Sequence, residues 1–294
     1  MPLSICSLTR PMLGLCAAAF AAPALAQTAL NTIRLYAVSE SHQLIAVSAA
    51  DPQKITRSVT LYGLEPNEHI LGIDYRVAYG VMFALGSSGR VFTVDVQSGA
   101  LKPVGETPFA LKLEGERFGF DFNPAADRIR IVSDNGQNLR AHPETGALVD
   151  FKPEADGLQP DGALAFHGDD ANAGRAPHVI AAAYTYNNEN EKLTTNFAID
   201  GVLGALLRQG SVEGLEPVVS PNTGQLSTVG ALGVAAITDA HFDISDVTNT
   251  ALAALTTRDA PTPTLYRIDL TTGQASVIGP IGNGEPLRGI AIEP

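Results

Sequence analysis

Three aspartates occupy the same position in three short segments of similar sequence. Each segment alternates a small or polar residue with a large apolar one, which is the period of a strand whose two faces differ. The segments are Leu71–Tyr75 with Asp74, Phe118–Phe122 with Asp121, and Ala240–Ile244 with Asp243. Each carboxylate could accept backbone N–H bonds from a neighbouring turn. Alternatively, the three could converge on a cation such as Ca²⁺, which takes about six to eight oxygen ligands.

A second group of polar residues is concentrated in residues 127–140. Period-2 alternation places Arg128 and Arg130 on one face of a strand that runs into the turn Asp134–Gly136. The segment could be a solvated hairpin with ion pairs, or its guanidinium groups could grip a carboxylate or a sugar, because arginine forms bidentate hydrogen bonds. In the second case the binding residues would be Arg128, Arg130, Asp134, Asn135, Asn138 and Arg140.

Local catalytic motifs are absent from the sequence. The six histidines show neither a His-x-His nor a His-Glu-x-x-His spacing. No Gly-x-Ser-x-Gly elbow, phosphate-binding glycine loop or dinucleotide fingerprint occurs. A site can still be assembled from loops that are distant in sequence. The sequence therefore predicts no particular catalytic residue.

The elements that would position these residues belong to a repeat. The alternating pattern returns in Gly162–Phe166 and Arg288–Ile292, with Ala165 and Ala291 in place of the aspartate. Three of the four spacings are close to the roughly 40 to 50 residues of one four-stranded propeller blade. We therefore predict an all-β propeller with five blades, in which these five segments are the innermost strands. A sixth blade could lie in the one long spacing, which holds further strand-like runs.

The two ends of the folded region predict how the ring closes. Three strand-like runs between Ile33 and Leu61 are one short of a blade, and Arg288–Ile292 is an innermost strand with no partner after it. If the last strand completes the first blade, the ring closes and its sheet edges are covered. The Pro- and Gly-rich stretches are all short, so we expect a single propeller domain over residues 27–294.

Residues 1–26 have the features of a secretory signal peptide. Arg10 precedes an apolar stretch from Met12 to Ala22, and Ala24-Leu25-Ala26 forms a small-residue cleavage site. Cleavage before Gln27 would remove both cysteines of the chain. We therefore expect a periplasmic or secreted bacterial protein that forms no disulfide and is not inserted in the membrane once the leader is removed.

The amino-acid composition and net charge limit the kinds of partner that we expect for this protein. The chain carries 31 acidic against 19 basic residues, a net charge of −12, and no basic stripe, so nucleic acid would be repelled. An apolar content of 45% without low-complexity tracts argues against disorder, while 28 Gly and 19 Pro fit a turn-dense β protein. We expect a monomer whose partner is a small molecule, a glycan or another protein.

Seven segments carry a resemblance to a known family: Leu71–Arg76, Phe83–Gly86, Phe118–Pro124, Asp127–Ser133, Gly136–Arg140, Asp161–Leu164 and Val229–Gly233. Together they are similar to the bacterial domain-of-unknown-function family 4394, over roughly Arg34 to Ile292. The resemblance implies a secreted, propeller-like protein, and it implies no catalytic residues because the family has no established activity. The connection Val212–Asn222 is longer than the family pattern leads us to expect.

These observations favour a binding or interaction module. The alternative is a propeller enzyme, such as a metal-assisted hydrolase of lactone or sugar substrates, in which the aspartates hold the ion and an Asp or His acts as the base. A structural component of the cell envelope is a third alternative. Fold alone does not decide between these functions.

Overall fold

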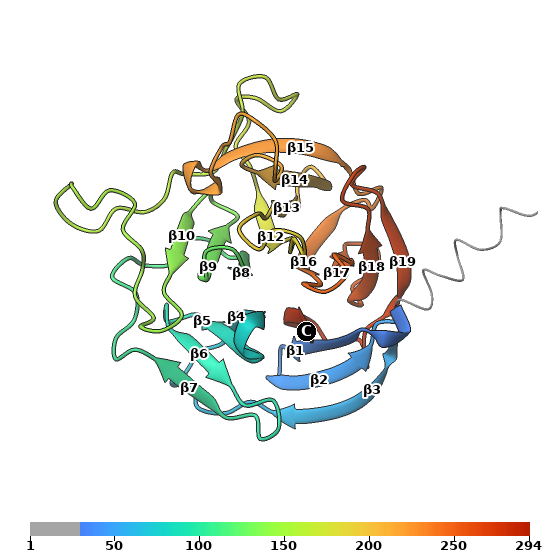
Figure 1. Cartoon of the computed structure of the whole chain (residues 1–294). Helices are drawn as coiled ribbons and strands as arrows, with labels where there is room; N and C mark the ends of the chain where they lie inside the picture. Colours follow the sequence, from blue (N-terminus) through green and yellow to red (C-terminus); the bar gives the residue numbers. More distant parts are fainter. Residues whose placement is uncertain (1–29) are drawn as a thin grey trace, which may run out of the picture.

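The strands surround a central axis in the computed structural model, which describes residues 30–294 (Figure 1). They form five sheets, which we number as blades 1 to 5 along the chain. Blade 1 consists of β1 (Arg34–Ser39), β2 (Gln43–Ser48), β3 (Asp51–Thr60) and β20 (Leu287–Ile292). Blade 2 consists of β4 (Ile70–Arg76), β5 (Val81–Gly86), β6 (Val91–Val94) and β7 (Leu101–Val104).

The remaining blades differ in strand number. Blade 3 has three strands, β8 (Phe118–Asn123), β9 (Arg128–Ser133) and β10 (Asn138–Ala141). Blade 4 has five, β12 (Val179–Tyr184), β13 (Asn196–Asp200), β14 (Ala205–Gln209), β15 (Gln225–Ala231) and β11 (Ala165–Phe166). Blade 5 has four, β16 (Ile237–Ile244), β17 (Ala251–Thr257), β18 (Thr264–Ile268) and β19 (Ala275–Pro280).

Helical structure is limited to short segments such as the 3₁₀ turns η1 (Val77–Tyr79) and η2 (Pro221–Thr223). Within residues 30–294, no helix has the length and apolar character needed to cross a bilayer.

The innermost strands β4, β8, β12, β16 and β20 pack against one another around the axis. This close approach explains the small residues of the repeat. A Cβ on Gly119 would lie 2.6 Å from the backbone nitrogen of Ala182 on β12, and one on Gly289 would lie 2.9 Å from the backbone nitrogen of Ile73 on β4. Glycine is therefore required at these two contacts between adjacent blades.

Buried apolar side chains fill the space between adjacent blades. One cluster joins Tyr36 and Val38 of blade 1 to Ile73 and Met82 of blade 2, and further clusters span the other blade interfaces. The core is thus divided among the interfaces instead of being concentrated at the axis. This arrangement leaves the axis free for the polar residues described below.

The C-terminal strand closes the ring, as the sequence predicts. β20 pairs antiparallel with β1, with Leu35 opposite Ile292 and Ala37 opposite Ile290. Blade 1 therefore contains strands from both ends of the folded region. The five sheets confirm the prediction of a five-bladed all-β propeller.

The predicted innermost strand of blade 4 is wrong. Gly162–Phe166 was expected there, but Ala165 and Phe166 form β11, which pairs in parallel with β15 on the outer edge of the blade. The innermost strand is β12, whose sequence Val-Ile-Ala-Ala-Ala-Tyr is buried throughout and so shows no polar alternation. The strand-like runs that could have formed a sixth blade are β13, β14 and β15 of blade 4.

Candidate ligand site at the propeller axis

The structure brings the three predicted aspartates together at the axis. Asp74 lies on β4, Asp121 on β8 and Asp243 on β16. One carboxylate oxygen of each lies within 4.8 Å of those of the other two, and all three side chains are buried. The equivalent residue of β12 is Ala183, not Ala165, and that of β20 is Ala291. Three of the five blades therefore supply a carboxylate to the axis.

Each aspartate accepts a hydrogen bond from the innermost strand of the next blade. These bonds run from Phe122 N–H to Asp74 Oδ2 (2.7 Å), from Tyr184 N–H to Asp121 Oδ1 (2.9 Å) and from Ile292 N–H to Asp243 Oδ2 (2.6 Å). Asp243 Oδ1 also accepts the N–H of Ile244, at 2.6 Å, and Asp74 accepts the N–H of Tyr75. The three carboxylates thus accept one backbone N–H from the innermost strand of each of the five blades. This includes blades 5 and 2, although the blades before them carry Ala183 and Ala291 in place of an aspartate.

Burial makes the ionised form of this cluster costly. Burial, followed by the charges of the neighbouring aspartates, raises the pKa of Asp74 and Asp121 well above the usual value. Burial also raises the pKa of Asp243 to about 6. Among the described residues, no lysine or arginine forms an ion pair with any of the three. The negative charge of the cluster is therefore not balanced from within the described chain.

A pocket opens at the end of the axis where the innermost strands finish. Its volume is about 380 Å³. The aromatic residues among its lining are Tyr75, Phe122 and Tyr186, and the charged ones are Arg76, Asp127, Glu191, Lys192 and Asp246. Tyr75 and Phe122 directly follow the axial aspartates of β4 and β8, so the pocket lies next to the carboxylate cluster. We call it the axial pocket.

Asp246 connects the axial pocket to the carboxylate cluster. It follows β16 and lines the pocket, and its charge repels those of Asp74, Asp121 and Asp243. Burial, followed by the charge of Asp243, raises the pKa of Asp246 to about 7. The alternating pattern does not indicate Asp246, because this residue falls after the alternating segment; its position three residues beyond Asp243 is the signal that could have found it.

Replacing Asp246 with asparagine is expected to stabilise the protein most at alkaline pH. A carboxyl whose folded-state pKa is raised to about 7 contributes fully to stability below its unfolded pKa and loses that contribution as the pH rises through 7. The difference in the free energy of unfolding between the variant and wild type should therefore be larger at pH 9 than at pH 5. The increase should be at least about 1.4 kcal/mol, which corresponds to one pKa unit.

Urea unfolding with EDTA present, at both pH values, measures this difference. Titrating groups that do not interact with Asp246 are common to both proteins and cancel. Asp156→Asn, at an exposed carboxyl, is the control and should show no such trend. A difference between Asp246→Asn and wild type that stays constant with pH would contradict the assignment of a raised pKa to this carboxyl.

The opposite end of the axis has a second cavity, of about 230 Å³, at the amino ends of the innermost strands. Both of its arginines form ion pairs: Arg117 lies 3.1 Å from Asp239, and Arg288 lies 3.3 Å from Glu40. His241 also lines this cavity, at a position where the other innermost strands carry glycine or alanine. Three buried nitrogens of this lining, Arg117 Nε, His241 Nε2 and Arg288 Nε, have no hydrogen-bond partner among the described residues, so this cavity is a second candidate site.

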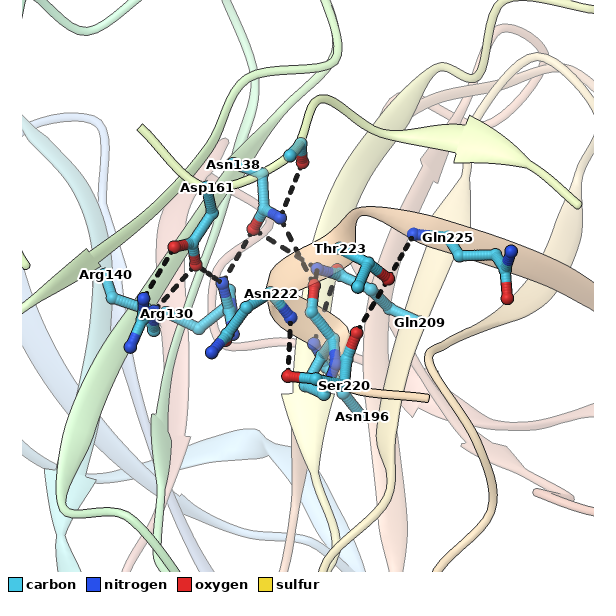
Figure 2. Close-up of polar contacts among 12 residues, drawn as sticks. Arg130, Asn138, Arg140, Asp161, Asn196, Gln209, Ser220, Asn222, Thr223 and Gln225 are labelled. Carbon is cyan, nitrogen blue, oxygen red and sulfur yellow. Dashed lines mark hydrogen bonds and ion pairs between the residues drawn. The ribbon is translucent and has the colours of Figure 1, made fainter. Parts of the chain in front are cut away.

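The second predicted group forms a buried network between blades 3 and 4 (Figure 2). Arg130 is 1% exposed and lies 2.6 Å from Asp161, which also accepts two hydrogen bonds from Arg140. Arg130 further donates to Asn138 and Asn222 and to the hydroxyl of Tyr184 on β12. Gln209 on β14 donates to Asn138 and to the carbonyl oxygen of Pro221.

The structure brings Arg130, Asn138 and Arg140 together but leaves Arg128, Asp134 and Asn135 outside this network. Arg128 donates to the carbonyl of Asp127, Asp134 accepts the N–H of Glu116, and Asn135 accepts the hydroxyl of Ser133. A solvated hairpin, one of the two interpretations of the sequence, is wrong for Arg130. Ligand binding by these six residues stays a prediction, although Arg130 already makes four hydrogen bonds within the chain through its five N–H groups.

The five sheets and the polar axis define a five-bladed β-propeller with a candidate ligand site at one end of its axis. The chain belongs to the family described as Domain of unknown function (DUF4394), whose model matches residues 43–291. No curated protein shows a significant sequence match.

Three solved structures to which the chain is similar are distant from it in sequence. A structural genomics protein of unknown function from Bacteroides thetaiotaomicron VPI-5482 is 12% identical, with a TM-score of 0.44 over 84% of this chain and 55% of that chain. TolB from Acinetobacter baumannii is 11% identical, with a TM-score of 0.44 over 87% and 55%. Dihydro-heme d1 dehydrogenase NirN in complex with DHE is 14% identical, with a TM-score of 0.36 over 84% and 43%. The chain spans about half the length of these proteins, and similarity at this level carries no information on its ligand.

Proposed function

We propose that the protein is an exported binding module that holds a small molecule in the axial pocket. Export rests on the predicted leader, which lies outside the described residues. Binding rests mainly on a pocket of about 380 Å³ that adjoins a buried cluster of carboxyls with no cationic partner among the described residues.

The lining of the axial pocket has the character of a small-molecule site. Such sites are concave, largely apolar, and contain a few polar groups that converge on the ligand. Here Tyr75, Phe122 and Tyr186 supply aromatic surface, and Asp246 supplies a carboxyl with a raised pKa. Strongly shifted titrating groups in a cleft are common at functional sites.

The alternative function, a metal-assisted hydrolase, would use the same cluster. Its ion would sit on Asp74, Asp121 and Asp243, whose oxygens are close enough to share one cation. Such an ion would supply Lewis-acid chemistry, and a Ca²⁺ titration tests for it below.

Filling the axial pocket tests whether it is the ligand site. Ala125 lines the pocket, whereas the neighbouring Ala126 is exposed and does not. Ala125→Trp should block the pocket, and Ala126→Trp adds the same side chain beside it. In a ligand-observed NMR screen with a panel of small aromatic and aliphatic fragments, hits on wild type should bind Ala126→Trp equally and bind Ala125→Trp at least tenfold more weakly.

Two results would overturn the proposal. One is a set of fragment hits that bind all three proteins with equal affinity, because the ligand site would then lie elsewhere. The other is a panel in which no fragment binds wild type, because a pocket of this size and lining should accept several of them.

A further inference from the structure

We propose that the ligand of the axial pocket is a small organic cation, with its ammonium group beside Asp246 and against the aromatic lining. This inference rests on the proposed function and names the class of ligand. It also predicts that an uncharged molecule of the same shape binds more weakly.

The pocket combines the two features that attract an ammonium group. Cations are attracted to the faces of aromatic rings, by about 0.5–1 kcal/mol at exposed sites and by about 2 kcal/mol or more where water is excluded. Tyr186 beyond β12 is the half-buried ring of this lining, whereas Tyr75 from blade 2 and Phe122 from blade 3, which are 4% and 6% exposed, contribute the small part of their surface that is not buried between the blades. Asp246 adds a carboxylate to the same lining.

The positive side chains of the pocket do not neutralise Asp246. Arg76 donates to both oxygens of Asp127, at 2.8 and 2.5 Å, and lies 2.5 Å from Glu144. Its guanidinium is also stacked 4.0 Å from the ring centroid of Tyr79. The charge of Arg76 is therefore compensated by Asp127, which lines the same pocket, and by Glu144.

Lys192 is the other cation of the pocket lining, and it is exposed at the rim. It lies next to Glu191, which lines the same pocket. Arg76 and Lys192 each lie beside acidic residues, and Asp246 forms no ion pair with either of them or with any other described residue. A ligand that carries one positive charge would supply a partner for the carboxylate of Asp246 once this group is ionised.

An organic cation fits this site better than a bare metal ion. Five backbone N–H bonds already hold the carboxylates of Asp74, Asp121 and Asp243 in place without an ion. The volume of about 380 Å³ also exceeds what one ion and its waters require. Both observations favour a ligand with an apolar body and a single charged group.

Choline and its uncharged isostere 3,3-dimethylbutan-1-ol test the inference, because they differ in charge and hardly in shape. In NMR titrations of the whole exported chain at pH 8, wild type should bind choline at least tenfold more tightly than the alcohol. Asp246→Asn should reduce this preference to less than threefold, and Asp246→Glu, which keeps the charge, should retain most of it. Lys192→Gln should bind choline as tightly as wild type or more tightly.

The outcomes separate the two proposals. If both compounds bind equally and Ala125→Trp abolishes both, the pocket is the ligand site but its charge preference is not as inferred. If neither compound binds, the cation inference fails, whatever fragments bind. If millimolar Ca²⁺ displaces choline, and Asp74→Asn or Asp121→Asn removes this effect, the cluster holds a metal ion and the inference is overturned.

Discussion

Truncation of the chain after Glu285 is expected to abolish cooperative folding. The deletion removes β20, the innermost strand of blade 1, and exposes the edge of β1. It also removes Leu287, Ile290 and Ile292, which are 6%, 2% and 5% exposed. Full burial of each such side chain contributes about 1.5–3 kcal/mol. Their combined loss is comparable to the whole free energy of unfolding of a typical domain, about 5–15 kcal/mol.

A shorter truncation provides the matched control. Ending the chain after Ile292 removes only Glu293 and Pro294 and keeps β20 and its pairing with β1. Glu293 lies 3.1 Å from Arg34 in an exposed ion pair, which is worth at most about 1 kcal/mol. Thermal unfolding should therefore show a transition close to that of wild type for this control. A cooperative transition within a few degrees of wild type for the Glu285 truncation would mean that ring closure by β20 is wrong.

Replacing Asp161 with asparagine is expected to cost about 3–5 kcal/mol, because breaking a buried ion pair leaves an uncompensated charge. The side chains of Arg130 and Asp161 are 1% and 0% exposed, and Arg140 bonds to the same carboxylate. Asparagine keeps the shape but removes the negative charge that both guanidinium groups share. Urea unfolding measures the loss, and hydrogen exchange should increase first in β9 and β10, which carry the two arginines.

Glu40→Gln is the control for this substitution. The ion pair of Glu40 with Arg288 is much more exposed, with side-chain exposures of 59% and 29%. Its removal should change the free energy of unfolding by less than about 1 kcal/mol. If Asp161→Asn costs as little as Glu40→Gln, the network of Figure 2 does not lock blades 3 and 4 together.

The axial aspartates could be predicted from the sequence because the repeat fixes their register. Asp74 and Asp121 each follow a glycine by two positions, Asp243 follows His241 in the same register, and a strand returns to the same face every two residues. The close approach of the blades enforces glycine at positions such as Gly119, so the pattern is visible without an alignment. The same pattern predicted ring closure, because β20 is an innermost strand without a blade of its own.

The innermost strand of blade 4 could not be predicted from the repeat. The innermost strand β12 is covered on both faces, so its sequence is a continuous apolar run without alternation. The short segment that does alternate, Gly162–Phe166, crosses to the outer edge and pairs in parallel with β15. Alternation indicates that one face of a strand is buried, but it does not indicate whether the strand is the innermost or the outermost one of its blade.

The partners of the polar residues were also hidden from the sequence. Asp161 lies in the segment before β11, and it meets Arg130 and Arg140 only because that segment folds over the three-stranded blade 3. Asp246 joins the axial cluster through the turn after β16. Both contacts depend on the path of a connection, which periodicity does not determine.

A crystal structure of the protein grown with choline at about pH 8 locates the ligand directly. The trimethylammonium group should lie in the axial pocket, beside the carboxylate of Asp246 and within about 6 Å of an aromatic ring centroid of Tyr75, Phe122 or Tyr186. An axial pocket that holds only solvent at saturating choline, or a choline molecule bound elsewhere on the propeller, would contradict the assignment of this pocket as a cation-binding site.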